Sequence, residues 1–357
     1  KRDVKKITAV SSPSLTVVLG EEIKIIGERI NPTGKKKLKE ALKNHNMDYI
    51  LLEAINQRDA GADILDVNVG LPEIDELEVM ISTIKELQSV VNLPLQIDSV
   101  RCDVIEAAVR IYNGKPLINS INGKDEIMDC IFPIVKKYGA CVIGLTIDED
   151  GIPATAEGRL KVAQKIVNRA AEYGIDKSDI IIDCLVLTAS AQQSEVKETI
   201  KAVQLVKATL GVKTTLGVSN VSFGLPSREL LNRTFLAAAL TAGLDAPILN
   251  PLSEAMMSTI HAFNVLWDTD KASKKYIKTY SSFEGKPTIE VSSDRDLDRV
   301  IIDGMKEEAT SLTKELLKTM SEMEVVNKYL IPSLDIVGLK YESGEIFLPQ
   351  LLQSAET

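Results

Sequence analysis

The chain has 357 residues, of which 45% are hydrophobic and 26% are charged, a balance typical of a globular protein large enough to bury its own core. The formal net charge at pH 7 is −9, and the only dense run of cations is Lys35, Lys36 and Lys37. A nucleic-acid surface is therefore not expected, because phosphate contacts need clustered cations. No apolar run reaches the roughly 18 residues of a membrane span, and no signal peptide is recognisable. We expect a cytoplasmic protein with neither nucleic acid nor membrane as a partner.

The four cysteines, Cys102, Cys130, Cys141 and Cys184, are scattered and form no Cys-x-x-Cys pair. We expect them to be unpaired, small apolar residues in a reducing compartment, not a disulfide framework or a zinc site. The chain opens at Lys1 without a methionine, in a polar stretch. This opening suggests a piece of a longer protein.

Short apolar runs alternate with longer stretches of helical periodicity. The runs that predict strands are 23–26, 64–67, 95–97, 117–118, 141–145, 180–182, 214–216 and 246–249. The stretches that predict helices are 48–60, 77–91, 103–111, 124–138, 159–173, 196–210, 227–242 and 253–266. Eight such units predict an α/β protein with a closed parallel (β/α)8 TIM barrel over residues 22–268. An open doubly wound sheet is less favoured, because the first strand-to-helix turn, 27–31, lacks the glycine-rich dinucleotide fingerprint.

The regions outside the predicted barrel show other sequence patterns. Residues 1–21 form an N-terminal extension, and residues 269–293 show little periodicity and read as a linker. Residues 294–357 predict a small, partial all-helical domain. Within it we expect helices over 294–323 and 325–330 and a break or restart of the helix at Pro332. We also expect an interruption of the helix at Gly338 and a last helix from 346.

Polar residues follow the predicted strands at their carboxyl ends. They are Glu28, Asn31, Asp66, Asn68, Asp98, Asn119, Asn122, Thr146, Asp148, Asp183, Ser219, Asn220 and Asn250. In a barrel they converge on one pocket at the C-terminal rim. A single Asp or Asn at such a point is more often a turn former or helix cap. Asp98, Asn119, Asp183 and Asn220, however, directly extend apolar strands, where an unpartnered polar group is costly. The set therefore predicts a ligand site.

Carboxylates and primary amides suit a neutral heterocycle with N–H donors and carbonyl groups. His45 and His261 lie apart in helical or loop stretches and offer neither a catalytic triad nor a zinc trio. A divalent metal on Asp66, Asp98 and Asp183 is a weaker alternative, because amides make up much of the remaining set. We therefore expect no metal.

At these residues the chain resembles the pterin-binding family, which includes dihydropteroate synthases and methyltetrahydrofolate methyltransferases. The resemblance rests on segments 26–31, 65–70, 96–99 and 118–122. Segments 144–146, 182–183, 217–224 and 232–236 are similar to the methyltransferase branch. The likeness covers about residues 22–268 and lies in the conjunction of these motifs.

The C-terminal part carries a second resemblance. Segments 331–338 and 344–352 resemble the helical cap that precedes a cobalamin-binding domain, so the order of barrel and cap is similar to the cobalamin-dependent methionine synthase family. The zinc-cysteine barrel and the Asp-x-His-x-x-Gly cobalamin motif of that family are not in this sequence. The resemblance implies cobalamin as the methyl acceptor and a cobalamin-binding domain or corrinoid protein as the partner.

The resemblance also implies residue roles. Asp98, Asn119 and Asp183 would bind the pterin ring, and Asn220 would lie near N5, with Asn220 and Asp98 as the catalytic residues. The other expected substrate-binding residues are Glu28, Asn31, Asp66, Asn68, Gly217, Ser219, Phe223 and Arg228. Phe223 would cover the pterin or simply pack in its loop. Arg228, like Arg29 and Arg233, would meet the glutamate tail of folate or serve as a rim charge.

The implied function is binding of 5-methyltetrahydrofolate and transfer of its methyl group to cob(I)alamin, the folate half-reaction of methionine synthesis. One alternative is a dihydropteroate synthase-like enzyme, which would need groups to hold a departing pyrophosphate. Segment 250–255 after the eighth strand lacks the Arg-x-His arrangement such an enzyme would offer. A second alternative is a non-catalytic folate and corrinoid docking module.

Overall fold

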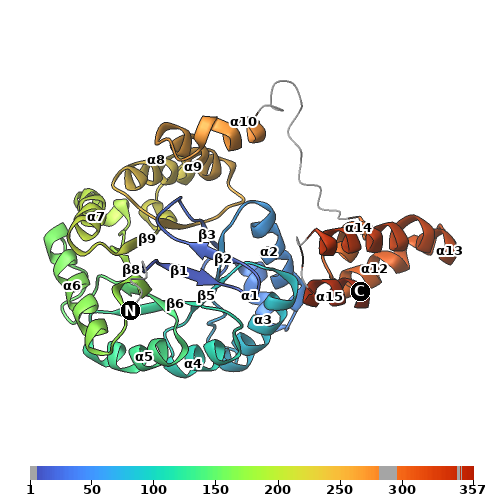
Figure 1. The fold of residues 1–357 in the computed structure, drawn as a ribbon, viewed down its shortest axis with the longest axis horizontal. Coiled ribbons are helices and arrows are strands. Elements are labelled where there is room, and N and C mark those ends of the chain that lie inside the picture. Colours follow the sequence, from blue (N-terminus) through green and yellow to red (C-terminus); the bar gives the residue numbers. More distant parts are fainter. Residues whose placement is uncertain (1–5, 281–295, 344–345, 347) are drawn as a thin grey trace, which may run out of the picture.

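The computed structural model describes residues 6–280, 296–343, 346 and 348–357. Eight parallel strands close into a barrel in the order β10-β3-β4-β5-β6-β7-β8-β9 (Figure 1), which confirms the predicted barrel. The strands are β3 (Ile26–Ile30), β4 (Ile64–Val67), β5 (Leu95–Asp98), β6 (Leu117–Asn122), β7 (Cys141–Leu145), β8 (Ile180–Asp183), β9 (Lys213–Gly217) and β10 (Ala246–Leu249).

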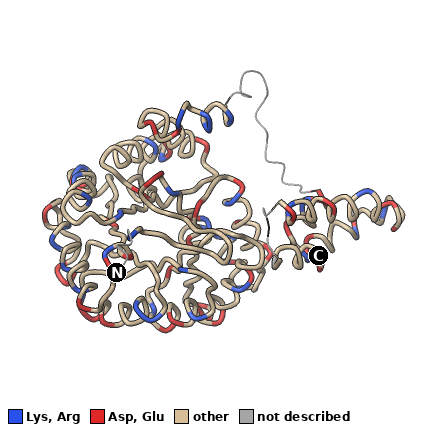
Figure 2. Tube along the Cα trace, in the orientation of Figure 1, with Lys and Arg blue, Asp and Glu red and all other residues tan. Residues whose placement is uncertain are grey.

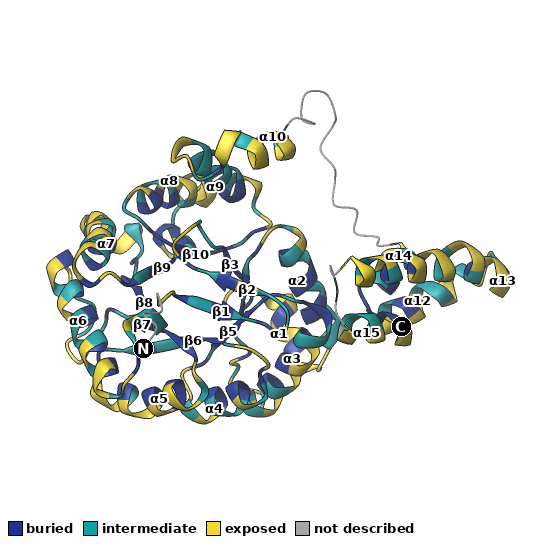
Figure 3. Ribbon diagram, in the orientation of Figure 1, coloured by how far each residue is buried: buried dark blue, intermediate teal, exposed yellow. Residues whose placement is uncertain are grey.

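Helices surround the barrel. They are α1 (Lys36–Lys43), α2 (Met47–Asp59), α3 (Glu76–Val90), α4 (Cys102–Ile111), α5 (Asp125–Tyr138), α6 (Ala156–Glu172), α7 (Ala189–Leu210), α8 (Arg228–Thr241) and α9 (Glu254–Leu266), with short 3-10 turns η1 (Lys177–Asp179) and η2 (Val218–Ser222). Buried residues fill the strands and the inward helix faces, and exposed residues cover the outward faces (Figure 3). Lys/Arg and Asp/Glu are interspersed around this outer ring (Figure 2). No described helix is both long and apolar enough to cross a membrane.

Five strands differ from the predicted bounds, three of them by a single residue at one or both ends and two by more. The first runs over Ile26–Ile30 instead of 23–26, because Ile25 is held before the strand by its backbone N–H, which donates 2.8 Å to the side chain of Asp63. The fourth extends to Asn122, because its polar end continues to pair with β7. Both differences carry polar residues into the barrel strands themselves, and so onto fixed backbone.

An N-terminal hairpin that the sequence reading did not identify closes the opposite end of the barrel. Strand β1 (Ala9–Ser11) pairs antiparallel with β2 (Thr16–Val18), and both cross the barrel in the view of Figure 1. Val10, Val17 and Leu19 form one buried cluster with residues near the starts of the barrel strands, among them Leu117 and Cys141. The hairpin therefore seals the N-terminal end, which leaves the C-terminal end as the open one.

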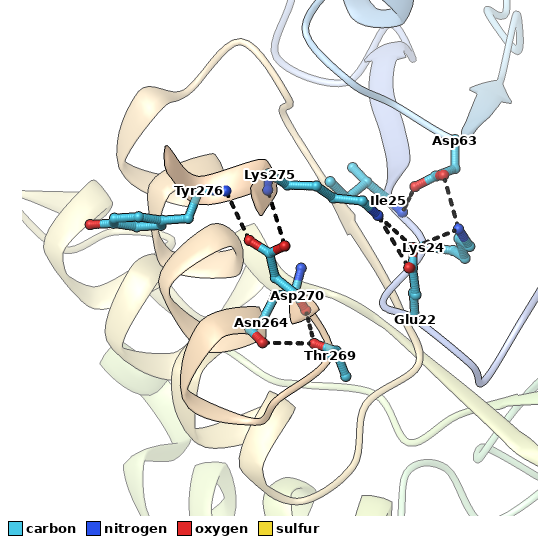
Figure 4. A network of polar contacts seen from close by, with 9 residues as sticks. All are labelled: Glu22, Lys24, Ile25, Asp63, Asn264, Thr269, Asp270, Lys275 and Tyr276. Atoms are coloured by element: carbon cyan, nitrogen blue, oxygen red, sulfur yellow. Dashed lines mark hydrogen bonds and ion pairs between the residues drawn. The ribbon is translucent and has the colours of Figure 1, made fainter. Parts of the chain in front are cut away.

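After the barrel the chain turns through η3 (Lys271–Ser273) into α10 (Lys274–Tyr280). Asp270 accepts hydrogen bonds from the backbone N–H groups of Lys275 (3.0 Å) and Tyr276 (2.8 Å). The ammonium of Lys275 lies 3.0 Å from Glu22, ahead of the first barrel strand (Figure 4). Residues 271–280 are thus helical where the sequence reading placed a linker, and the rest of that linker, 281–293, lies outside the described residues.

The C-terminal segment is helical, as predicted. Its elements are α11 (Leu297–Ile302), α12 (Lys306–Leu316), α13 (Glu322–Val325), the π-helical turn η4 (Val326–Leu330), α14 (Ile331–Glu342) and α15 (Leu348–Glu356). Pro332 stands in the first turn of α14, where a missing N–H is tolerated, so it restarts a helix. The prediction that Gly338 interrupts a helix is wrong. Gly338 lies inside α14, next to the buried Val337, and packing there outweighs the roughly 1 kcal/mol that glycine costs in a helix.

This helical segment packs against one flank of the barrel, beside α2 and α3 (Figure 1). Leu297, Val300, Ile301 and Met305 are buried in the same hydrophobic cluster as the barrel helices. Two arginines join the parts, because Arg58 on α2 contacts the carboxylate of Asp303 and Arg299 on α11 contacts the carboxylate of Asp59 at the end of α2. The segment is therefore docked by apolar burial and by an ion-pair network.

One expectation about the cysteines is wrong. Cys102 and Cys130 form a disulfide between α4 and α5, with Cα atoms 6.4 Å apart. The sequence hides this pair because its members are 28 residues apart and meet only when the two helices pack side by side. Cys141 and Cys184 are buried and free, as predicted.

Candidate active site

A cavity of about 480 Å³ opens at the carboxyl ends of the barrel strands. It brings together every expected catalytic and substrate-binding residue except Asn68, whereas the strand-end residues Asn122, Thr146, Asp148 and Asn250 do not line it. Its lining consists of Glu28, Asn31, Thr33, Gly34, Lys35, Asp66, Asp98, Asn119, Leu145, Asp183, Gly217, Ser219, Asn220, Phe223, Arg228 and Ile248. Glu28 and Ile248, separated by 220 positions in the chain, meet here because the lining residues lie on the barrel strands or on the connections that follow them.

Two neighbouring carboxyl groups, Asp66 and Asp98, stand at the ends of β4 and β5. Burial raises the pKa of Asp98 from its ordinary value of 3.8 to about 6, while a hydrogen bond with Asn68 lowers it. Burial, and next the charge of Asp98, raise the pKa of Asp66 well above its ordinary value. The amide of Gln96 donates a 2.6 Å hydrogen bond to Asp66. The pair is thus desolvated and ready to accept donors from a ligand.

Asn68 contacts this pair of carboxyl groups without lining the cavity. Its side-chain oxygen accepts a 2.9 Å hydrogen bond from the backbone N–H of Gly70, and its side chain also hydrogen-bonds Asp98. Asn68 therefore contacts Asp98, and direct contact with a substrate stays a prediction.

A third carboxyl group, Asp183, ends β8 on the other side of the cavity. Burial raises its pKa from 3.8 to about 7, against the backbone N–H of Leu185 and the charge of Arg159, both of which lower it. Arg159 is fully buried and donates to the carbonyl oxygens of Pro153 and Leu185, each at 2.9 Å. This guanidinium fixes the loop that follows Asp183, so that the carboxyl group is held in place.

The turn after β9 places Asn220. A Cβ atom on Gly217 would lie 2.9 Å from the Asn220 Nδ2 atom, so glycine leaves the space that the amide occupies. The hydroxyl of Ser219 donates a 3.1 Å hydrogen bond to Glu28 on β3, which ties this turn across the cavity. Burial raises the pKa of Glu28, and the bond from Ser219 lowers it. Asn220 therefore sits on a turn fixed at both ends.

Phe223 and Arg228 form the rim beyond this turn. The Arg228 guanidinium lies 4.4 Å from the centre of the Phe223 ring, and it also donates to the Ser222 hydroxyl and the Ser219 carbonyl, each at 3.0 Å. Phe223 is 46% exposed, so its ring borders the opening rather than the core. Arg29, in contrast, turns away from the cavity and pairs with Glu53 at 3.0 Å.

Comparison with known proteins places this cavity in a family. Residues 27–250 match the pterin-binding enzymes, and this match spans more than half of the chain. The chain belongs to the pterin-binding enzyme family. Residues 294–357 match a B12-binding domain.

Relatives of known name agree with this membership. The chain is similar to a methionine synthase of Mycobacterium tuberculosis, with 30% identity over 100% of this chain and 33% of that protein. It is also similar to a methylcorrinoid:tetrahydrofolate methyltransferase of Eubacterium limosum, with 30% identity over 72% of this chain and 95% of that protein. The chain thus spans about a third of the length of the methionine synthases it matches.

Among solved structures, a dihydropteroate synthase of Xanthomonas albilineans with 4-aminobenzoic acid has a TM-score of 0.56 and 18% identity. The superposition covers 74% of this chain and 99% of that one. At this identity the likeness shows the barrel fold that the pterin-binding family shares.

Several cavity residues of this family member escaped the sequence reading. Thr33, Gly34 and Lys35 follow β3 on the rim, and Leu145 and Ile248 supply apolar wall. The Lys35 ammonium donates to the carbonyl oxygens of Glu28 and Asn31, each at 3.0 Å. The run of lysines is the sequence signal that could have indicated Lys35.

The cavity residues make a site for an uncharged, hydrogen-bonding ring. Asp98, Asn119 and Asp183 all line it and supply hydrogen-bonding groups, and Leu145 and Ile248 add apolar contact. Among the residues described, no group of three or more His, Cys, Asp or Glu side chains is placed to hold a metal ion.

Proposed function

We propose that this chain binds 5-methyltetrahydrofolate in the cavity and transfers its methyl group to cob(I)alamin, the folate half-reaction of methionine synthesis. The observation that carries the proposal is the meeting of three polar residues of the barrel strands, Asp98, Asn119 and Asp183, with the amide of Asn220 in one cavity of a pterin-binding enzyme. The relatives named methionine synthase and methylcorrinoid:tetrahydrofolate methyltransferase support the same reaction.

The pterin ring fits the donor and acceptor pattern of the cavity. An ionised carboxylate accepts paired hydrogen bonds from an amino group and an adjacent ring N–H, and an amide both donates and accepts. Asp98 and Asp183 would take the first role and Asn119 the second. Because burial holds both carboxyl pKa values above normal in the free protein, hydrogen bonds from the ring would stabilise the ionised forms.

Methyl transfer needs help at N5 of the folate. The bond from N5 to the methyl carbon breaks, the carbon bonds to the nucleophilic cobalt of cob(I)alamin, and the electron pair left on N5 takes up a proton. A tertiary amine is a poor leaving group, so positive charge at N5 must be stabilised in the transition state. The fixed Asn220 amide would hydrogen-bond the protonated N5, and a water or a carboxyl group of the cavity would supply the proton.

The methyl acceptor would meet the open C-terminal face of the barrel. The match of residues 294–357 to a B12-binding domain supports a corrinoid as that acceptor. Apolar side chains on the helical segment fit the methyl-rich edge of a corrin ring, since Met323 and Leu339 are each 66% exposed. We propose a division into a folate barrel (22–268) and a partial cobalamin cap (294–357), with a cobalamin-binding domain or corrinoid protein as partner.

The deciding experiment mixes the chain with 5-methyltetrahydrofolate and free cob(I)alamin and follows the absorbance of methylcobalamin. Methylcobalamin should form at a rate that saturates with folate. If the folate binds and no methylcobalamin forms above the rate without protein, the chain is a docking module and the proposed catalysis is wrong.

A dihydropteroate synthase-like activity is the weaker alternative. The cations that line the cavity in the described chain are Lys35 and Arg228, and Lys35 is engaged with backbone carbonyl groups. Incubation with a pterin pyrophosphate and 4-aminobenzoic acid should give no pteroate. We place the methyl-transfer reaction in the cytoplasm, without nucleic acid or membrane, as part of the same proposal.

A further inference from the structure

One carboxyl group of the cavity has no role in the proposed chemistry. The carboxyl groups that line the cavity are those of Glu28, Asp66, Asp98 and Asp183. In the proposed function Asp98 and Asp183 accept hydrogen bonds from the ring as anions. Asp66 already accepts hydrogen bonds from the side-chain amides of Gln96 and Asn31, which hold it as an acceptor. Glu28 is the carboxyl group that remains.

Glu28 lies on the side of the cavity that carries Asn220. Its Oε1 atom accepts a 3.1 Å hydrogen bond from the hydroxyl of Ser219, the residue before Asn220. In the closed barrel a single strand, β10, separates β3 from β9, so Glu28 and the turn after β9 meet across that strand. Asp66 is tied instead to β5, through the bond from Gln96. Glu28 is therefore the carboxyl group in direct contact with the turn that holds Asn220.

The hydrogen bond from Ser219 is compatible with a protonated carboxyl group. A protonated carboxyl group donates through one oxygen and still accepts through the other. The bond from Ser219 uses Oε1, which leaves Oε2 to carry the proton. Because Glu28 lines the cavity, a bound ligand can take up that proton.

The surroundings of Glu28 act on its charge in opposite directions. Burial has the largest effect and raises its pKa, whereas the bond from Ser219 and the charges of Lys35, Arg29 and Arg228 lower it. The neighbouring carboxyl group of Asp66 also has a raised pKa, in part because of the charge on Glu28. Lys35 is itself engaged with the backbone carbonyl oxygens of Glu28 and Asn31. Burial thus favours the uncharged, protonated form of Glu28.

We propose that Glu28 is the acid that protonates N5 of the folate during methyl transfer. This inference rests on the proposed methyl-transfer function and names the proton source for it. As the methyl carbon leaves N5 for the cobalt nucleophile, the electron pair of the broken bond stays on N5 and takes the proton from Oε2 of Glu28. The carboxylate that results takes up a proton from solvent before the next turnover. Asn220 hydrogen-bonds N5, and Ser219 orients the acid.

The pH dependence of single-turnover methyl transfer to free cob(I)alamin, at saturating folate, tests the acid. Glu28→Gln keeps the size of the side chain and removes its acidity, so the rate at pH 7 should fall by about 100-fold, the lower end of a general acid's contribution. The unaltered chain should reach a plateau at low pH, where Glu28 stays protonated. The variant should instead accelerate steadily as pH falls, because N5 then depends on solvent for its proton.

A second measurement needs no cobalamin. Carbon-13 NMR of the chain with labelled glutamate carboxyl groups and bound 5-methyltetrahydrofolate follows each carboxyl group with pH, and the signal that disappears in Glu28→Gln belongs to Glu28. This signal should still shift at a pH at which exposed glutamates are fully ionised. If Glu28 ionises together with the exposed glutamates, it has no proton to give at pH 7 and the proposal is wrong.

Three further variants separate the acid from its neighbours. Glu28→Asp retains an acid and should restore the plateau at a lower rate, and Ser219→Ala should keep the plateau because the acid is still present. Glu229→Gln is the matched control. Glu229, on α8, also accepts a hydrogen bond from a serine hydroxyl, that of Ser253 at 2.7 Å, but does not line the cavity. Its rate and pH profile should equal those of the unaltered chain.

Other outcomes overturn the proposal. If Glu28→Gln binds folate and keeps both the rate and the plateau, another group supplies the proton and the proposed function stands. If the plateau is lost in Asp66→Asn or Lys35→Gln and kept in Glu28→Gln, that other residue is the acid. If the unaltered chain forms no methylcobalamin, this proposal and the proposed function fail together.

Discussion

The side-chain amide of Gln96 donates a 2.6 Å hydrogen bond to the carboxylate of Asp66, and both residues are buried. Gln96 stands two residues before Asp98 on β5, so both side chains point to the barrel interior. The Gln96 Oε1 atom has no protein partner in the described chain. Gln96 therefore serves to orient Asp66 beneath the cavity.

Gln96→Leu, a change of similar volume, should lower the free energy of unfolding by about 1–2 kcal/mol, because it leaves a buried carboxyl group short of a donor. Folate affinity should fall with it as Asp66 loses its orientation. Urea unfolding at pH 7 and folate titration measure the two effects. Gln164→Leu, which removes an exposed helix-surface bond to Asn168, is the control and should change stability by less than about 0.5 kcal/mol. Equal stability of the two variants would show that the Gln96 bond contributes little.

Asn220→Ala tests the group nearest the reacting nitrogen. We expect single-turnover methyl transfer to slow by roughly 100-fold, the order lost when one polarising donor is removed. Folate binding should change far less, because Asp98, Asn119 and Asp183 remain. Rapid-mixing absorbance of cob(I)alamin and methylcobalamin measures the rate. An unaltered rate with folate bound rules out this role, and Asn232→Ala, on the same β9–β10 connection but not part of the cavity lining, serves as the matched control.

Asp98 and Asp183 were predictable because an apolar parallel strand that stops at a carboxyl group places a costly polar group at a known end of a barrel. Asn119 was found by the same argument, although it lies inside β6. Other residues that support the site could not be predicted in this way. Gln96 lies inside a strand, and an argument from strand ends does not include such a position. Arg159 reads as a charge on an amphipathic helix, and only tertiary packing shows it fully buried behind Asp183.

The N-terminal hairpin and the disulfide could not be predicted either, because both depend on contacts between elements. Strands β1 and β2 have three residues each, too few for a periodic pattern, and they are stabilised only by the barrel end they cover. The disulfide between Cys102 and Cys130 depends on the packing of two helices. The local sequence pattern thus predicts the barrel and the polar residues at its strand ends. The residues that hold those side chains in place depend on contacts between elements and could not be predicted from it.

Asp183 predicts how stability depends on pH. Its pKa is raised in the folded chain from 3.8 to about 7, so the unfolded chain releases this proton first. The folded state therefore loses stability as pH rises from about 4 to about 7 on account of this group, by up to about 4 kcal/mol. Asp183→Asn removes the penalty. At pH 8 the variant without ligand should melt at a higher temperature than the unaltered chain, and at pH 4 this gain should vanish.

The same substitution should weaken folate binding, because an amide cannot accept both ring donors that a carboxylate accepts. In the unaltered chain folate affinity should fall as pH drops below about 7, since the carboxyl group must then give up its proton to bind. Calorimetric titration from pH 5.5 to 8 measures the slope. A pH-independent affinity would show that Asp183 does not contact the ring as an anion. Asp176→Asn, an exposed carboxylate at the opposite end of the barrel, is the control.

Asp303 links the helical segment to the barrel. Its side chain is only 4% exposed, and its carboxylate oxygens lie 3.4 Å from Arg58 on α2 and 3.1 Å from Arg299 on α11. Asp303→Ala leaves both guanidinium groups without this shared partner. Because the arginines are partly exposed, we expect a loss of about 1–2 kcal/mol, less than for a fully buried pair.

The loss should fall on the helical segment and spare the barrel. Hydrogen exchange of the amides in α11 should quicken by roughly tenfold, since 1.4 kcal/mol corresponds to that factor, while exchange in the barrel strands and folate affinity stay the same. Glu315→Ala, on α12, breaks the pair with Lys318 beyond the end of that helix, in which both side chains are exposed, and should leave α11 unaltered. If Asp303→Ala also leaves α11 unaltered, the Asp303 pairs contribute little, and the apolar contacts of Leu297, Val300 and Ile301 with the ion pair between Arg299 and Asp59 hold the segment on the barrel.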